Sequence, residues 1–225
     1  MKTYLSIAIA SILALGATGI ANASPLFVTA TIGGVPSVSG ATLENFDGPS
    51  PSILTLSGSA YLTTVYPAFG YTPPYFSGST AAYFGESPTI GYDASQYVAV
   101  ETGGSATLNF STPQKYLGLL WGSVDKSYNY LTFYDGANNV IGTVLGTDLT
   151  GVNDHDGGQN GTAYVNITST TAFSKVVVNT SGAQGYYSFE FDDVAYAMVV
   201  PEPASGVLVG AGLCMLGLVL RRKSA

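Results

Sequence analysis

The sequence predicts an all-β protein, an antiparallel, jelly-roll-like β-sandwich with an N-terminal signal helix and a C-terminal transmembrane helix. Nine short runs between residues 26 and 198 are rich in β-branched and aromatic residues, as strands are. Turn-forming pairs such as Asp135-Gly136 and Ser181-Gly182 separate the runs. No amphipathic helical run of eleven or more residues lies between the two terminal segments. The region between them therefore has the pattern of one β domain.

The first 23 residues have the pattern of a secretory signal peptide. Lys2 is the only charged residue among them, residues 7–20 are apolar, and Ala21-Asn22-Ala23 is a small-residue cleavage site. We therefore expect cleavage after Ala23, with Ala21 and Ala23 as the recognised small residues. The exported β domain would span residues 24–198.

The predicted strands are residues 26–32, 95–100, 106–110, 116–121, 129–134, 140–144, 163–167, 175–179 and 186–198. Residues 116–121 are apolar on both faces, with Leu117, Leu119 and Trp121 on one face and Leu120 on the other. This pattern predicts a central strand that is buried on both sides. Trp121 is interpreted as a core residue in preference to a sugar-stacking platform.

Residues 61–97 combine many aromatic side chains with proline and glycine and have poor strand periodicity, so we expect much of this segment to be loop. A tyrosine ring offers a flat apolar face and a hydroxyl, which suits contact with a sugar ring. Tyr66, Tyr71, Tyr75 and Tyr92 are the candidate glycan contacts. The alternative is a long loop whose aromatic side chains pack down on the sheet.

Acidic residues gather in two segments near the ends of the domain, residues 44–47 and 190–193. The first and last strands of such sandwiches often lie side by side, so we expect the two segments to meet. Oxygen-rich clusters suit calcium, and Glu44, Asp47 and Asp192 are the candidate ligands of a structural Ca²⁺. Two further interpretations stay open: a glycosidase pair facing across a groove, or solvated acids at strand ends.

Residues 24–200 contain 13 acidic residues against three lysines and no arginine. Phosphate groups are neutralised by Lys and Arg, so this balance argues against a nucleic-acid partner. The only cysteine, Cys214, lies outside the β domain, which therefore contains no disulfide. The single histidine, His155, excludes a zinc site built from several histidines.

The C-terminal segment, residues 199–225, has three parts in a fixed order. Pro201-Glu202-Pro203 precedes an uncharged run over residues 204–220, and Arg221, Arg222 and Lys223 follow. As a helix the run would span about 26 Å, just under the roughly 30 Å hydrocarbon core. Basic residues remain cytoplasmic, so the β domain would lie on the other side of the membrane.

This order resembles the PEP-CTERM sorting signal of Gram-negative bacteria that make extracellular polysaccharide. The resemblance implies that exosortase, a membrane enzyme with a cysteine nucleophile, recognises the segment and releases the protein from a temporary anchor. Residues 118–123 (GLLWGS) and 189–196 (FEFDDVAY) also resemble a β-sandwich domain that is common among PEP-CTERM proteins. This second resemblance covers approximately residues 95–197.

The resulting hypothesis is an exported, non-enzymatic cell-surface or extracellular-matrix protein that contacts polysaccharide. It would be held in the membrane by its C-terminal helix before exosortase processes it. The alternatives are a carboxylate-based glycoside hydrolase and a purely structural coat protein. No combination of nucleophile, base and orienting residue stands out in the sequence, which favours the non-enzymatic hypothesis.

Overall fold

The computed structural model describes residues 24–48, 53–64, 71–182 and 187–198. The predicted signal peptide with Ala21 and Ala23, the predicted transmembrane helix and the sorting residues Pro201, Glu202, Pro203, Arg221, Arg222 and Lys223 lie outside these residues, as does Tyr66. Within the four described ranges, no helix has the length and apolar character needed to cross a membrane.

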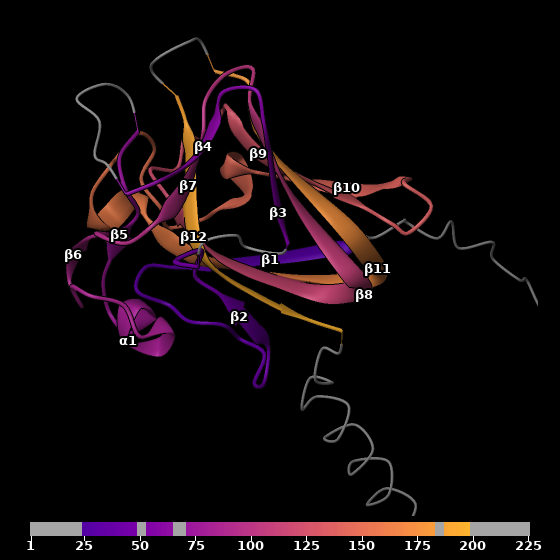
Figure 1. Cartoon of the computed structure of the whole chain (residues 1–225), viewed down its shortest axis with the longest axis horizontal. Coiled ribbons are helices and arrows are strands. Elements are labelled where there is room, and N and C mark those ends of the chain that lie inside the picture. The colour runs from indigo at the N-terminus through magenta and orange to yellow at the C-terminus, as the bar shows by residue number, and fades with distance from the viewer. Residues whose placement is uncertain (1–23, 49–52, 65–70, 183–186, 199–225) are drawn as a thin grey trace, which may run out of the picture.

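Two strands of 18 residues each, β8 (Ser105–Gly122) and β11 (Ala163–Thr180), form the frame of the fold. They pair antiparallel along both of their halves, and the register shifts between the halves, at Thr168 and Phe173. Each half continues into a different layer, so both layers of the sandwich share these two strands (Figure 1).

The first layer has the order β3, β8, β11, β9, β10. It contains the N-terminal half of β8 and the C-terminal half of β11, with β3 (Leu54–Ser57), β9 (Asn129–Tyr134) and β10 (Val140–Leu145). Alternating burial along β9 shows that one face of this layer packs on the core and the other is more exposed.

The second layer has the order β1, β11, β8, β12, β7, β4. It uses the other halves of β8 and β11, together with β1 (Leu26–Thr31), β12 (Phe189–Ala197), β7 (Tyr97–Val100) and β4 (Ala60–Thr63). The short strand β2 (Thr42–Glu44) pairs with the end of β12. β12 is therefore hydrogen-bonded on both of its edges.

Phe173 lies where β11 passes from one layer to the other. It is fully buried and packs edge-on against Phe110 and Phe133, with ring centroids 5.7 Å and 5.1 Å away. Pro113 lies at the corresponding point of β8, where its missing N–H is compatible with interrupted pairing. Aromatic side chains thus fill the corner at which both long strands bend.

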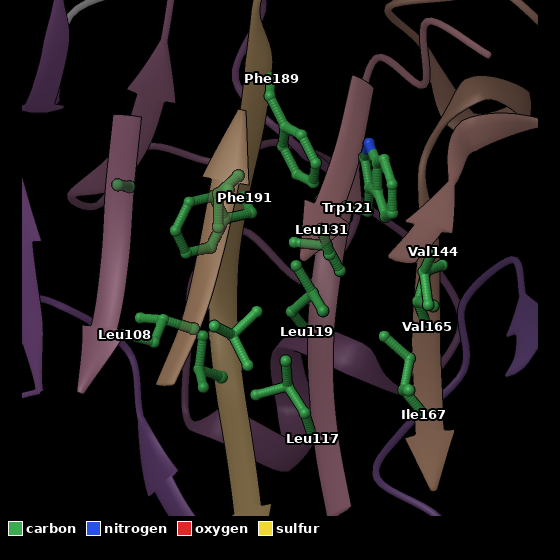
Figure 2. Close-up of a cluster of buried hydrophobic side chains, with 14 of the residues drawn as sticks. Leu108, Leu117, Leu119, Trp121, Leu131, Val144, Val165, Ile167, Phe189 and Phe191 are labelled. Carbon is green, nitrogen blue, oxygen red and sulfur yellow. The ribbon is translucent and has the colours of Figure 1, made fainter. Parts of the chain in front are cut away.

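The hydrophobic core lies between the two layers (Figure 2). Leu108, Leu131 and Val144 from the first layer meet Leu119 and Trp121 from the second. Trp121 is fully buried and stacks on Phe189 at a centroid distance of 4.1 Å. Its interpretation as a core residue agrees with this position, because no sugar can reach its ring.

The segment between β4 and β7, which we call the covering excursion, packs on the outer face of the second layer. The excursion between β4 and β7 carries β5 (Tyr75–Phe76), α1 (Thr80–Phe84) and β6 (Gly91–Tyr92), and Figure 1 shows these elements together at one side. Phe76 and Ala81 from this excursion pack on Leu120 and Tyr164 of the sheet. The second half of β8 is consequently buried on both faces, as residues 116–121 predicted.

The predicted strands are confirmed, except that two pairs of them each form one continuous strand. Residues 106–110 and 116–121 form the single strand β8, and residues 163–167 and 175–179 form β11. Residues 61–97 hold more regular structure than expected, although it comes in pieces of two to five residues. Pieces this short leave little periodicity in a sequence. Two 3₁₀ turns, Gly146–Asp148 and Gln159–Gly161, lie in the connection from β10 to β11.

Candidate functional site

Three buried acids on the outer face of the second layer form what we call the carboxylate cluster: Asp93, Asp192 and Asp193. Asp192 and Asp193 are each 0% exposed and Asp93 is 3% exposed. Asp93 follows β6 in the covering excursion, whereas Asp192 and Asp193 belong to β12. The fold therefore brings together acids that are about 100 positions apart in the sequence.

An irregularity in β12 brings two consecutive acids, Asp192 and Asp193, into the carboxylate cluster. Phe191 and Val194 point into the core, and the pairing of β12 with β8 shifts register between Asp192 and Ala195. Asp193 has a φ of 51°, a left-handed conformation that is uncommon for a residue other than glycine. Such bulges re-aim side chains and are frequent beside functional sites.

The cluster has more acceptor oxygens than donors. Oδ1 of Asp93 accepts from the Ser95 backbone N–H at 2.7 Å, and Oδ1 of Asp192 accepts from the Asp193 N–H at 2.7 Å. Four buried oxygens have no hydrogen-bond partner: Oδ2 of Asp93, Oδ2 of Asp192 and both carboxylate oxygens of Asp193. Buried polar groups are normally satisfied, so this set needs an explanation.

Burial and mutual repulsion raise the pKa values of Asp192 and Asp193 in the cluster. Burial, followed by the neighbouring carboxylates of Asp193 and Asp93, raises the pKa of Asp192 well above its usual value. Burial, followed by the charges of Glu86, Asp93 and Asp47, raises the pKa of Asp193 to about 9. Among the described residues, the only recorded ion pairs join His155 to Asp125 and Asp154, so no lysine neutralises the cluster.

Of the predicted calcium ligands, Asp192 belongs to the carboxylate cluster, whereas Glu44 and Asp47 lie at the edge of the cluster. β2 pairs with β12 through Glu44 and Val194, so the two acidic segments do meet. Oε1 of Glu44 already accepts from the Phe46 N–H at 3.0 Å, and Oδ1 of Asp47 accepts from the Gln96 N–H at 3.1 Å. Asp192 is the member of the set that is fully buried.

Sequence reasoning did not assign Asp93 or Glu86 to the site, and it included Asp193 in the acidic segment without choosing it as a calcium ligand. Asp193 was adjacent to a chosen residue, and only its left-handed backbone places it beside Asp192 on the same face. The signal for Asp93 was Asp93-Ala94-Ser95, in which the carboxylate accepts from the N–H two residues later and closes a tight turn. Nothing in the sequence shows that this turn folds onto β12.

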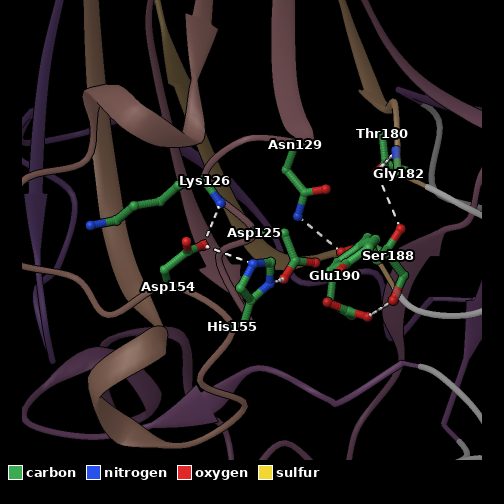
Figure 3. Close-up of polar contacts among 10 residues, drawn as sticks. Asp125, Lys126, Asn129, Asp154, His155, Thr180, Gly182, Ser188 and Glu190 are labelled. Carbon is green, nitrogen blue, oxygen red and sulfur yellow. Dashed lines mark hydrogen bonds and ion pairs between the residues drawn. The ribbon is translucent and has the colours of Figure 1, made fainter.

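A second polar cluster ties three loops together at one end of the sandwich (Figure 3). Nδ1 of His155 lies 2.6 Å from Oδ1 of Asp125, and Oδ1 of Asp154 accepts from the Lys126 N–H at 2.9 Å. Nδ2 of Asn129 donates to the Ser188 carbonyl at 2.9 Å, and the Ser188 hydroxyl donates to Glu190. These bonds hold the loop around His155 against the connection between β8 and β9, and Asn129 joins the start of β9 to the residue before β12.

Two of the three acids in this second cluster, Asp125 and Glu190, are buried. Burial raises the pKa of Asp125 to about 6 against the opposing effect of His155. Burial also raises the pKa of Glu190 well above its usual value, with the charge of Asp125 adding to the effect. Glu190 is 1% exposed, so its carboxyl group does not face a groove as a glycosidase residue would.

The three described candidate glycan contacts, Tyr71, Tyr75 and Tyr92, take part in two aromatic pairs. Tyr71 stacks with Tyr61 at a centroid distance of 6.0 Å, and Tyr75 meets Tyr92 edge-on at 5.2 Å. Tyr61 and Tyr92 are 42% and 46% exposed. The covering excursion and the adjoining strand β4 thus combine packed and exposed tyrosines, and the glycan contact stays a prediction.

A groove of about 360 Å³ lies elsewhere, near the end of β12. Its lining residues are Val38, Ser39, Gly40, Thr42, Thr112, Gln114, Tyr196, Ala197 and Met198. None of the three described candidate tyrosines, Tyr71, Tyr75 and Tyr92, lines it.

Comparisons with known proteins place the C-terminal segment in a family of sorting signals. Residues 199–223 match the PEP-CTERM protein-sorting motif, as the sequence predicted. No curated protein sequence matches the chain.

Solved structures with a similar chain path include the K2 cleaved adhesin domain of Lys-gingipain, at 10% identity and a TM-score of 0.41 over 72% of this chain and 100% of that one. The C-terminal family 22 carbohydrate-binding module of a Clostridium thermocellum protein has 15% identity and a TM-score of 0.34 over 73% and 99% of the two chains. A glycoside hydrolase family 43 arabinoxylan arabinofuranohydrolase from Bacillus subtilis has 14% identity and a TM-score of 0.33 over 51% and 23%. Similarities at this level assign no activity.

Proposed function

We propose that the chain is an exported surface protein of a Gram-negative bacterium, anchored briefly by its C-terminal segment and then released by exosortase into the extracellular matrix. The observation that carries the proposal is the PEP-CTERM sorting motif at residues 199–223. The uncharged run and basic cluster supply the length and the charge asymmetry of a C-terminal anchor. The β domain is the part that remains after processing.

Removal of the sorting motif tests this destination. Deletion of residues 201–203 in the native host should leave the protein in the membrane fraction at its unprocessed size, because the processing enzyme no longer recognises the segment. Cell fractionation and immunoblotting measure the result. Gly48→Ala, an exposed change within the β domain, is the control and should be released like the wild type. Normal release of the deletion variant would contradict the proposal.

For the released domain we propose a non-catalytic contact with polysaccharide through Tyr66, Tyr71, Tyr75 and Tyr92. Support comes from the aromatic pairs on the covering excursion and from the exposed ring of Tyr92. Aromatic faces bind sugar rings without requiring charge, which suits a domain with 13 acidic residues and three lysines. The buried position of Glu190 supports a binding role in preference to glycoside hydrolysis.

Affinity electrophoresis in gels that contain the host polysaccharide tests the contact. Tyr71→Ala combined with Tyr92→Ala should reduce retardation several-fold, since each change removes a stacking face. Phe27→Ala is the matched control, because Phe27 is 57% exposed but lies on β1. Equal retardation of all three proteins would exclude these tyrosines, and no retardation of the wild type would favour a purely structural coat protein.

A screen with chromogenic glycosides separates binding from hydrolysis. We expect no turnover by the wild type. Turnover that disappears in Glu44→Ala, Asp47→Ala or Glu190→Ala would instead establish a carboxylate-based glycosidase.

A further inference from the structure

The carboxylate cluster is not explained by sorting or by glycan contact. Asp93, Asp192 and Asp193 are at least 97% buried and present four oxygens without a hydrogen-bond partner. Half-buried Glu86 and exposed Asp47 add negative charge at the edge of the site. Transfer of ionised carboxylates into such an environment is strongly unfavourable unless they are paired.

Only protons or a cation could satisfy the unpartnered oxygens and remove the repulsion between the carboxylates. The described residues offer no basic side chain in contact with the cluster, since their recorded ion pairs all involve His155 at the other site. Protonation would supply a few donors, but each neutral carboxyl group would still leave acceptor oxygens unused. A cation satisfies several lone pairs at once and removes the mutual repulsion.

We propose that Asp93, Asp192 and Asp193 bind a divalent cation, for which Ca²⁺ is the best match. Their four unpartnered oxygens would supply part of the six to eight oxygen ligands that calcium takes. This set differs from Glu44, Asp47 and Asp192, the set that the sequence predicted, and shares only Asp192 with it. In this site Glu44 and Asp47 shape the adjoining turn through their bonds to backbone N–H groups.

The chemistry of the donors selects calcium. All candidate ligands are oxygens, whereas zinc favours histidine and cysteine, and the only histidine lies in the other cluster. Magnesium keeps several waters in its coordination shell, and a site whose three acids are at least 97% buried leaves little access for them. Calcium tolerates irregular sets of six to eight oxygens, including backbone carbonyls.

The cation would also complete the arrangement of the three side chains. Within the described part of the chain, no three acid, histidine or cysteine side chains are already positioned around one point as metal ligands. Repulsion between carboxylates without a counter-ion opposes such convergence. A bound ion would reverse this repulsion and fasten the covering excursion, through Asp93, to the bulge in β12.

Thermal unfolding of the full-length chain, purified in detergent and stripped with chelator, tests the site. Calcium at about 100 times its dissociation constant should raise the Tm by roughly 5–10 °C. Magnesium at the same concentration should have a much smaller effect. Asp193→Asn should abolish the calcium-dependent rise, whereas Asp148→Asn, which removes an exposed charge from a 3₁₀ turn, should preserve it. A wild type with the same Tm in calcium and in chelator would overturn the proposal, as would a full rise in Asp193→Asn.

Terbium luminescence provides a test that does not depend on a variant folding. The Tyr164 hydroxyl donates to the Asp193 carbonyl at 3.0 Å, so an ion in the cluster would lie close to an absorbing ring. Excitation of tyrosine should therefore sensitise bound Tb³⁺ in the wild type, and added Ca²⁺ should displace the signal. Absence of sensitised emission, or emission that calcium does not displace, would overturn the proposal.

Discussion

At the scale of single residues, burial determines what each acid can do. Asp135 is partly exposed and accepts from the Asn139 side-chain amide and from the N–H groups of Asn139 and Ala137, bonds that lower its pKa and stabilise a turn. Asp125 is 4% exposed, and burial raises its pKa although His155 lies 2.6 Å away. The same residue type therefore closes a turn in one place and makes stability depend on pH in another.

The raised pKa of Asp125 predicts how stability changes in mild acid. Its pKa is about 6 in the folded chain and near 3.9 when unfolded. The folded state therefore binds more protons between about pH 4 and 6, and its stability falls as pH rises through that range. Between about pH 4 and 6, the Tm of Asp125→Asn should therefore fall less than that of the wild type. The difference should be roughly 2–4 °C for each kcal/mol of pH-dependent stability that the variant no longer has.

His155, Asp154 and Glu190 also interact electrostatically with Asp125, so the comparison uses differences between variants. Asp148→Asn is the control and should follow the wild-type pH profile. If Asp125→Asn and the wild type had the same dependence of Tm on pH, Asp125 would not be the group responsible for it.

The stacked position of Trp121 predicts a stability effect without an effect on binding. Trp121→Ala removes a fully buried ring from its contact with Phe189 and should cost about 3–5 kcal/mol in urea unfolding. Trp121→Phe should cost less because it keeps an aromatic ring. Polysaccharide retardation of the folded fraction should not change. Lost retardation with normal stability would instead assign Trp121 to a sugar site.

At the scale of elements, the sequence predicts where strands run better than where they end. The alternation and burial of residues 116–121 were predicted because core-forming side chains leave a local pattern. Ser111-Thr112-Pro113 has the composition of a turn, yet the chain bends there and continues as β8. Whether a turn sequence reverses the chain or bends it depends on partners far away in the sequence, here Phe133 and Phe173.

The second half of β8 also depends on a missing side chain. A Cβ atom at Gly118 would lie 2.5 Å from the Tyr116 hydroxyl oxygen and 2.7 Å from that of Tyr164. Both tyrosines are buried over this strand, so neither can move away easily. Gly118→Ala should therefore cost about 1–3 kcal/mol in urea unfolding. Gly48→Ala, with no atom within 4 Å of the added Cβ, should leave stability unchanged. Equal stability of the two variants would show that the tyrosines repack.

At the scale of the whole molecule, the fold class could be predicted from the sequence and the carboxylate cluster only in outline. Strand composition and turn spacing specify an antiparallel sandwich. The expected meeting of residues 44–47 with 190–193 is confirmed by the pairing of Glu44 with Val194. The general rule about first and last strands does not explain it, because β1 pairs with β11 and the strand near the N-terminus that pairs with β12 is β2. The contribution of Asp93 could not be predicted, because it depends on how the excursion between β4 and β7 folds back onto the sheet.

The absence of cysteine from the β domain predicts that its stability is independent of redox conditions. Cys214, the only cysteine, lies in the C-terminal apolar run. Reducing agent should therefore leave the Tm of the full chain unchanged in differential scanning fluorimetry, and Cys214→Ser should behave identically. If reduction lowered the Tm of the wild type, and Cys214→Ser had this lower Tm with and without reducing agent, a cross-link between copies through Cys214 would be indicated.

The two-sided pairing of β12 has a mechanical consequence. β12 ends at Ala197, directly before the C-terminal segment, so any force transmitted through that segment enters the fold along this strand. β8 holds one edge of β12, and β7 and β2 hold the other. A pull along the strand must shear both rows of hydrogen bonds together, whereas an edge strand would detach one row alone. A domain connected in this way resists extension at the point where a cell envelope would pull on it.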